Sequence, residues 1–242
     1  GCVANNGYEV FIGSEAGKCM VGDSSVAIGR QAMMGGSSGT SGNDAVAIGM
    51  YAGKETTSAA GNVLIGRDAG SSITTGGCNV ALGIYAGEDL TTNYNNVLIG
   101  HGAGHNGNGL ANVFIGFGAG CSNTSCVPAE NAAVGCFAGR CLTSGTLNAF
   151  FGASAGCLNT SGTCNTVIGS EGAGALTTGS QNTLLGSFGG YNLSTGSHNV
   201  AIGYCAQFPS ATGSKQLVIG CNTSYWIKGD SNFDIETNNI VP

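Results

Sequence analysis

The segment 102–107 has the G-x-G-x-x-G spacing with which nucleotide-binding proteins hold a pyrophosphate. That chemistry needs a helix directly after the glycines, and the sequence around this segment predicts none. His101 and His105 lie four residues apart, a spacing that brings two imidazoles to one metal ion only on a helix. We therefore predict no nucleotide site, no metal site and no cofactor here.

Catalytic chemistry is not predicted elsewhere in the sequence. The three His residues occupy repeat positions with no special context, so no Ser-His-Asp set is indicated. Asp68, Glu88 and Asp89 lie near predicted corners of the chain, where solvated acids are the expected role. We predict that the protein is not an enzyme and has no catalytic residues.

The 11 cysteines are candidates for covalent chemistry, and none of them has the C-x-x-C spacing of a zinc site. Two pairs lie within single loops, and a third pair falls near the same phase of adjacent repeats. In an oxidising compartment we expect these pairs to be disulfides. The predicted pairs are Cys121–Cys126, Cys157–Cys164 and Cys205–Cys221.

Four N-x-S/T sequons are the other candidates for modification. In a secreted eukaryotic protein they would be glycosylation sites, and in a phage protein they would have no such meaning. The sequence leaves both interpretations open. The four residues are Asn123, Asn159, Asn192 and Asn222.

Composition narrows the class of protein. Gly accounts for 45 of the 242 residues, and charged residues are 8%, where roughly 25% is usual. The 42% of hydrophobic residues exclude a disordered chain, and the lack of a three-residue Gly period excludes collagen. Seven scattered basic residues against a net charge of −6 argue against nucleic-acid binding. No apolar run approaches the roughly 20 residues of a membrane span. The sequence starts at Gly1 without Met, and we expect a processed chain or a fragment.

One repeat fills the chain from about residue 9 to residue 220. Its unit is Asn-apolar-apolar-Ile-Gly-x-x-Ala-Gly, and we call the glycine after the Ile position the marker glycine. Eight of the twelve intervals between successive marker glycines are 17 residues long. The marker glycines are Gly13, Gly29, Gly49, Gly66, Gly83, Gly100, Gly116, Gly135, Gly152, Gly169, Gly186, Gly203 and Gly220.

A 17-residue unit is too short for a helix pair or a propeller blade, and it suits one coil of a β-solenoid. We predict an all-β fold, a β-solenoid of about 13 coils of 17 residues over residues 1–220. After residue 220 the repeat ends. Residues 221–242 are expected to be a C-terminal cap or a transition into another segment.

Each unit predicts a short strand that is apolar on both faces. The residue before the marker glycine and the residue two positions earlier share one face, because side chains alternate along a strand. We assign that face to the core of the coil. The middle residue should then face outward, and because it is apolar in every unit we predict that it is buried between chains. The larger members of this inter-chain stripe are Phe11, Leu64, Leu98, Phe114, Phe150, Val167, Leu184 and Val218.

An Asn stands four residues before the marker glycine in nine consecutive units. Stacked Asn side chains can hydrogen-bond along an array of strands, so we predict an Asn ladder with a stabilising role. Ligand binding is not the expected role of these residues. They are Asn62, Asn79, Asn96, Asn112, Asn131, Asn148, Asn165, Asn182 and Asn199.

The units Ser-Val-Ala-Ile-Gly at 25–29 and Asn-Val-Ala-Ile-Gly at 199–203 resemble the repeat of trimeric autotransporter adhesin heads. The longer unit at 182–196 is similar to the tail-fibre repeats of bacteriophages and cyanophages. The resemblance covers nearly the whole chain and implies a left-handed parallel β-roll with three chains side by side. The adhesin unit is shorter than this one, and the cysteine content is unusual for either family.

The resemblance implies a fibre or adhesion module on a virion surface or in the extracellular space. Such a module is a stiff, non-catalytic homotrimeric rod that presents a binding tip to a cell-surface glycan or receptor, without nucleic acid and without membrane insertion. The cysteine pairs and sequons favour an alternative, the subunit of a glycosylated extracellular filament stacked end to end. Ice binding is a minor alternative, because Thr-Thr pairs begin at Thr74, Thr91 and Thr177 but form no flat array.

Overall fold

The structure is a computed structural model that describes residues 8–20, 24–35, 44–107, 109–121, 128–221, 224–230, 232 and 234–237. The described residues contain β-strands and no helix. They fall into two compact units, Gly1–Pro128 and Ala129–Pro242. The strands are β1 (Val10–Ile12), β2 (Val26–Ile28), β3 (Val46–Ile48), β4 (Val63–Ile65), β5 (Val80–Leu82), β6 (Val97–Ile99), β7 (Val113–Ile115), β8 (Ala132–Val134), β9 (Ala149–Phe151), β10 (Thr166–Ile168), β11 (Thr183–Leu185), β12 (Val200–Ile202), β13 (Leu217–Cys221), β14 (Ser224–Gly229) and β15 (Ile235–Thr237).

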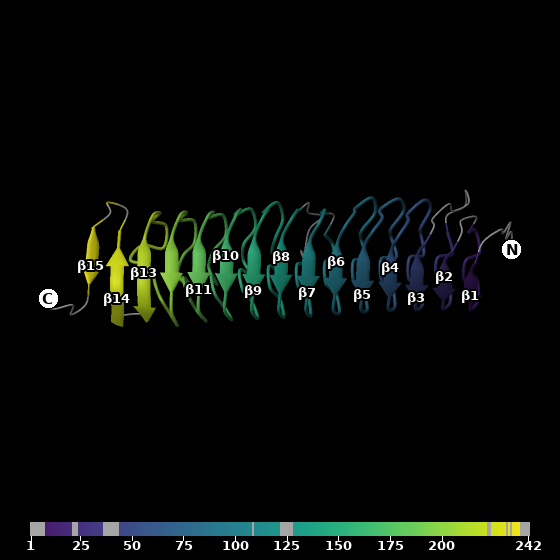
Figure 1. Cartoon of the computed structure of the whole chain (residues 1–242), viewed down its shortest axis with the longest axis horizontal. Coiled ribbons are helices and arrows are strands. Elements are labelled where there is room, and N and C mark those ends of the chain that lie inside the picture. The colour runs from purple at the N-terminus through teal and green to yellow at the C-terminus, as the bar shows by residue number, and fades with distance from the viewer. Residues whose placement is uncertain are drawn as a thin grey trace. The chain divides into compact units, whose positions relative to one another are not determined.

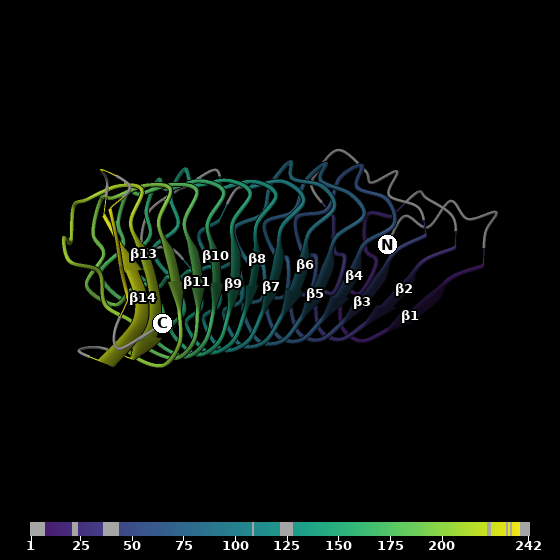
Figure 2. The ribbon, with the colours of Figure 1, turned by 60° about the vertical axis from the view of Figure 1, so that its left-hand side comes forward.

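The N-terminal unit is a stack of parallel strands, β1 to β7, each of which pairs with the next (Figure 1). The pairing joins equivalent repeat positions, so that Leu64 of β4 lies opposite Ala81 of β5. After each strand the chain turns and returns behind it before the next strand begins (Figure 2). This is the β-solenoid that the repeat predicts, and the predicted fold class is confirmed.

The C-terminal unit repeats this architecture from β8 to β13 and then changes direction. β14 pairs with β13 in the antiparallel sense, with a bulge between Ile219 and Gly220, and β15 pairs antiparallel to β14. The reversed arrow of β14 is visible in Figure 1. The reversal follows the last marker glycine, where the sequence repeat ends.

The marker glycines directly follow strands β1 to β12, and Gly220 lies within β13; all have a backbone conformation that other residues rarely adopt. All thirteen have φ between 128° and 144°. A Cβ on Gly100 would lie 2.5 Å from the carbonyl oxygen of Gly116, and one on Gly135 would lie 2.5 Å from that of Gly152. The residue must therefore be Gly for two reasons, its dihedral angles and the close approach of the next coil.

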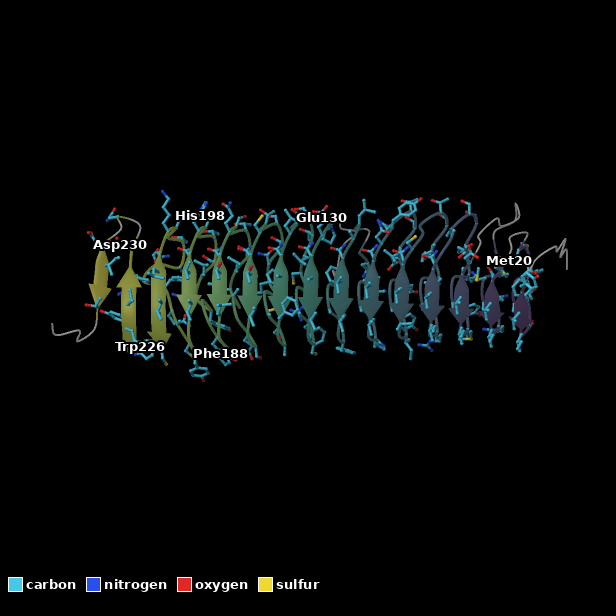
Figure 3. The ribbon with its side chains drawn as sticks, viewed as in Figure 1. Met20, Glu130, Phe188, His198, Trp226 and Asp230 are labelled. Atoms are coloured by element: carbon cyan, nitrogen blue, oxygen red, sulfur yellow. The ribbon has the colours of Figure 1, made fainter. Side chains whose placement is uncertain are left out.

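Other turn positions hold non-glycine residues in the left-handed region. Glu130 and His198 precede their strands with φ of 57° and 62°, and Phe188 follows its strand with φ of 57°. Figure 3 shows Glu130 and His198 at the edge of the C-terminal unit where strands begin and Phe188 at the edge where they end. These left-handed residues form the corners at the two ends of each short strand.

The middle residue of each strand points into its own coil, which corrects the predicted assignment of the faces. Phe11, at the start of the stack, is partly buried, and the other predicted stripe residues are 0–2% exposed within one chain. They therefore do not form an inter-chain stripe. The residues to which this correction applies are Phe11, Leu64, Leu98, Phe114, Phe150, Val167, Leu184 and Val218.

The Ala-Gly corner gives the physical reason for this inward direction. The Ala is buried, and the Gly after it provides the space that the middle side chain of the strand fills. A Cβ on Gly104 would lie 2.7 Å from Cδ2 of Leu98, and one on Gly156 would lie 2.7 Å from Cε1 of Phe150. Gly at the corner leaves room for a Leu or Phe at the middle position, whereas the corners with Met33 and Ala173 face the smaller Ala27 and Val167, so the two positions belong to one packing unit.

The predicted Asn ladder is confirmed inside both units. The backbone N and the side-chain Nδ2 of Asn165 both donate to Oδ1 of Asn148, at 2.9 and 3.1 Å, and Nδ2 also donates to the carbonyl of Gly179 at 2.9 Å. The nine ladder residues are 0–2% exposed, and Gln216 continues the ladder beyond Asn199. Each Asn therefore links neighbouring coils and ties the strand to a loop of the next coil.

Candidate functional site

The flanking residues of each parallel strand point away from the core, and we call the surface they form the outer face. In the N-terminal unit they are Val10, Ile12, Val26, Ile28, Val46, Ile48, Val63, Ile65, Val80, Leu82, Val97, Ile99, Val113 and Ile115. In the C-terminal unit they are Ala132, Val134, Ala149, Phe151, Thr166, Ile168, Thr183, Leu185, Val200, Ile202, Leu217 and Ile219. Apart from two Thr, all are apolar.

The outer face is open to solvent in the single chain. Ile12 is 58% exposed, Ile168 is 48% exposed and Phe151 is 41% exposed. Most of the other flanking residues are half-buried, because their neighbours on adjacent strands cover their sides. Contiguous apolar surface of this kind on a folded chain commonly marks an interaction site. The outer face is therefore the first candidate functional site.

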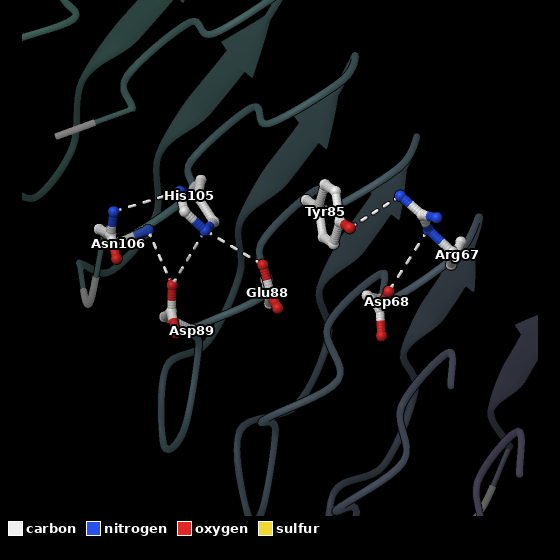
Figure 4. A network of polar contacts seen from close by, with 7 residues as sticks. All are labelled: Arg67, Asp68, Tyr85, Glu88, Asp89, His105 and Asn106. Atoms are coloured by element: carbon white, nitrogen blue, oxygen red, sulfur yellow. Dashed lines mark hydrogen bonds and ion pairs between the residues drawn. The ribbon is translucent and has the colours of Figure 1, made fainter. Parts of the chain in front are cut away.

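The turns after the marker glycines carry a second set of candidates in the N-terminal unit. Arg67 donates to the Tyr85 hydroxyl at 2.7 Å, lies over that ring at 4.8 Å from its centroid, and contacts Asp68 at 3.5 Å (Figure 4). Arg30 makes the same kind of contact to Tyr51. These exposed pairs join neighbouring coils, and each contributes about 0.5–1 kcal/mol at most.

His105 and two carboxylates form the densest polar cluster in these turns. Nε2 of His105 lies 3.1 Å from Oε2 of Glu88 and 3.5 Å from Oδ2 of Asp89 (Figure 4). The backbone N of Asn106 donates to Oδ2 of Asp89 at 3.2 Å, and its Nδ2 lies 3.1 Å from Nδ1 of His105. One ligand-type atom from each of Glu88, Asp89 and His105 lies within 4.8 Å of the others, and all three residues are half-buried.

This cluster borders a surface hollow of about 340 Å³, lined by Tyr85, Glu88, His101, Gly102 and His105. Tyr85 meets the ring of His101 edge-on, with centroids 5.9 Å apart. Burial raises the pKa of the Glu88 carboxyl above its usual range; the nearby imidazole of His105 lowers it, and the nearby negative charge of Asp89 raises it further. At this position the charged form of Glu88 is therefore less favourable than in open solvent.

The sequence predicted no metal site at His101 and His105, because a spacing of four residues brings two imidazoles to one metal ion only on a helix. The structure brings both rings to one hollow, but the group with metal-type spacing is Glu88, Asp89 and His105. The positions of these residues within the repeat could have predicted this group. Glu88 and His105 each stand five residues after a marker glycine, so parallel stacking in register places one above the other.

The thiols of Cys157 and Cys164 are free, so the bridge predicted between them for an oxidising compartment is absent from the structure. The two residues pack against different parts of the preceding coil. The backbone N of Cys141 donates to the carbonyl of Cys157 at 3.1 Å, whereas the N of Cys164 donates to the carbonyl of Thr146 at 3.0 Å. Burial raises the pKa of the Cys157 thiol.

Cys205 and Cys221 are also free thiols, so the third predicted bridge is absent from the structure. A hydrogen bond with Cys205 raises the pKa of the neighbouring Tyr204 hydroxyl. For the Cys121–Cys126 pair, Cys126 lies outside the described residues, and the prediction stays untested.

The sequon at Asn159 is not a surface site. Asn159 is fully buried, and neither polar atom of its side chain has a hydrogen-bond partner. It stands seven residues after its marker glycine, the position that the buried Leu142 and Leu176 occupy in the neighbouring coils. The glycosylation prediction is therefore wrong for Asn159, because a three-residue pattern carries no information about burial.

The sequon at Asn192 lies in a contact between coils. Its Nδ2 donates to the carbonyl of Phe208 at 2.8 Å, and its Oδ1 accepts from the N of Phe208 at 3.1 Å. Both ends of the amide are thus engaged in a half-buried side chain. Asn123 and Asn222 lie outside the described residues, and their glycosylation stays a prediction.

Comparisons of the chain with protein-family models, with curated proteins and with solved structures found no match. Among the described residues, no helix has the length and apolar character that crossing a membrane would require.

Proposed function

We propose that the chain is a structural, non-catalytic β-solenoid module of a virion fibre or surface adhesin. In this proposal, copies of the chain pack their outer faces together, as a homotrimer, to form a stiff rod. The rod holds a binding tip that meets a cell-surface glycan or receptor. The protein acts in the extracellular space or on the surface of a virion.

The observation that carries the proposal is the exposed apolar outer face. Removing a half-exposed Ile such as Ile168 from water gains about 1 kcal/mol, and within each unit the flanking residues of successive parallel strands line such a surface. A second copy of the same chain suits the surface because it carries the same side chains at the same strand spacing of about 4.8 Å. Self-association is also the usual way in which identical surfaces are covered.

The competing proposal of an end-to-end filament has less support. A following copy would have to continue the sheet from β15, which runs antiparallel to β14, and not from a parallel coil of the solenoid. Of the two described sequons, Asn159 is buried and Asn192 is engaged between coils. Ice binding also has less support, because hydroxyls such as that of Thr74 donate to carbonyls of the next coil.

The test compares charges on and off the outer face. A double variant, Ile65→Asp with Ile168→Asp, places one carboxylate on the outer face of each unit. The control, Leu110→Asp with Leu147→Asp, changes two turn residues that are also about half exposed, at 47% and 54%.

Light scattering and native mass measurement should show the wild-type protein and the control at the mass of three chains. The outer-face variant should shift to single chains, with an unchanged circular dichroism spectrum. Single chains for the wild-type protein, or equal masses for wild type and outer-face variant, would refute the proposal.

A further inference from the structure

We propose that Glu88, Asp89 and His105 bind a divalent transition-metal ion, such as Zn²⁺, Ni²⁺ or Co²⁺, between two successive coils of the N-terminal unit. The inference concerns a ligand of the chain and is independent of self-association. It rests on donor geometry, on the charge balance of this turn and on the rigidity of the backbone that carries the three side chains.

Two of the three distances between the donor atoms are close to those around such an ion. Two donors about 2.1 Å from a tetrahedral or octahedral metal lie about 3.0–3.4 Å apart. Nε2 of His105 is 3.1 Å from Oε2 of Glu88 and 3.5 Å from Oδ2 of Asp89. Small shifts of the two carboxylates would therefore complete a three-donor site, and the half-exposed position leaves room for water as further ligands.

The charge balance favours a cation at this position. Among the described residues, the ion pairs of Glu88 and Asp89 are made with His105 alone, so two carboxylates face one imidazole. The nearby Arg67 is engaged by Asp68 and Tyr85 (Figure 4). A divalent ion would neutralise both carboxylates and leave the imidazole neutral, the form in which it binds metals.

In other turns of the N-terminal unit, a neighbouring Lys neutralises the charge of the carboxylate. Glu15 pairs with Lys18 at 2.7 Å, and Glu55 pairs with Lys54 at 2.8 Å. Each of these turns supplies its own cation. The turn at 88–89 carries two acids and no Lys or Arg, and the turn stacked on it supplies an imidazole.

The backbone fixes the positions of the three side chains. The N of Gly87 donates to the carbonyl of Ala103 at 2.9 Å, which joins the two turns directly before Glu88 and His105. The side chain of Asn106 lies at Nδ1 of His105, on the ring edge opposite the carboxylates. In this geometry Nδ2 of Asn106 donates and Nδ1 of His105 accepts. With a metal ion at Nε2, Nδ1 carries the proton, so the Asn106 amide would turn to accept that hydrogen bond through its Oδ1.

The donor set also selects the class of ion. Imidazole nitrogen favours Zn²⁺, Ni²⁺ and Co²⁺, whereas sites built of oxygen alone favour Ca²⁺ and Mg²⁺. One imidazole with two carboxylates therefore fits a transition metal. Bound there, the ion would cross-link the coil that begins with β5, which carries Glu88 and Asp89, to the coil that begins with β6, which carries His105.

The experiment is a calorimetric titration of the full chain with Zn²⁺ at neutral pH, comparing His105→Asn with the control His198→Asn. His198 is an exposed turn residue of the C-terminal unit, and both variants keep all 11 cysteines. Any thiolate site is thus equal in the two proteins. The variants Glu88→Gln and Asp89→Asn test the two carboxylates in the same way.

The wild-type protein and His198→Asn should bind one Zn²⁺ that His105→Asn binds at least about tenfold more weakly or not at all. Glu88→Gln and Asp89→Asn should weaken the same site, with unchanged circular dichroism spectra for all variants. Failure of the wild-type protein to bind Zn²⁺, or equal binding by His105→Asn and His198→Asn, would overturn the proposal. Neither result would alter the mass measurements that test self-association.

Discussion

The inner and outer faces of the same strands differ in what surrounds them, although both are apolar. On β11, Leu184 is fully buried against the corner glycine Gly190, while its neighbour Leu185 lies on the outer face. The two side chains have the same chemistry and lie one residue apart. The difference shows that hydrophobicity alone does not tell which face of a strand is buried, and that the position of the corner glycine decides which side chain enters the core of its own coil.

The largest expected effect comes from shortening one side chain on each face. Leu184→Ala should lower the free energy of unfolding by about 2–5 kcal/mol, because it leaves a cavity in a packed core. Leu185→Ala should change it by less than about 1 kcal/mol, as is usual for surface positions. Urea denaturation in the Ile65→Asp, Ile168→Asp background measures both values without a contribution from assembly. Equal losses at the two positions would contradict the assignment of the faces.

A smaller effect is expected where the inner face holds a polar residue. Asn159→Leu replaces an unpartnered buried amide by the side chain that Leu142 and Leu176 supply in the neighbouring coils. It should raise the free energy of unfolding by about 1–3 kcal/mol, the cost of an unsatisfied buried polar group. Thermal unfolding followed by circular dichroism tests this. The matched change Asn165→Leu in the fully bonded ladder should destabilise the protein, and stabilisation by both changes would show that the ladder contributes nothing.

The smallest effect concerns two thiols that differ in burial. Burial raises the pKa of the Cys157 thiol. At a pH near 8, the fraction of Cys157 in the reactive thiolate form is therefore smaller than for an ordinary cysteine. Iodoacetamide should label Cys157 more slowly than the exposed Cys164, and the rate at Cys157 should keep rising at higher pH. Peptide mass mapping at timed intervals gives the two rates. Faster labelling of Cys157 would show that its turn opens readily.

The sequence predicted the features that recur in every 17-residue repeat. The marker glycines predicted where strands β1 to β12 end, because their φ values and the close approach of the next coil admit no side chain. The Asn column predicted a ladder, because identical amides at a fixed spacing lie next to their equivalents in neighbouring coils and can bond to them. The thirteen parallel strands of the two units lie at the predicted positions.

The tertiary structure decided which features of the repeat face one another. Strands of three residues that are apolar on both faces leave the direction of the core open, and the corner glycines resolve it only once the coil is closed, as Gly104 does for Leu98. The burial of Asn159 and the meeting of His105 with Glu88 likewise depend on register between coils. The sequence by itself determined the repeat period of the solenoid, because each sequence repeat adopts the same local conformation. Only the folded structure decided what each side chain touches, because those contacts join distant positions of one closed coil, as for Leu98 and Gly104, or residues about one repeat apart, as for Glu88 and His105.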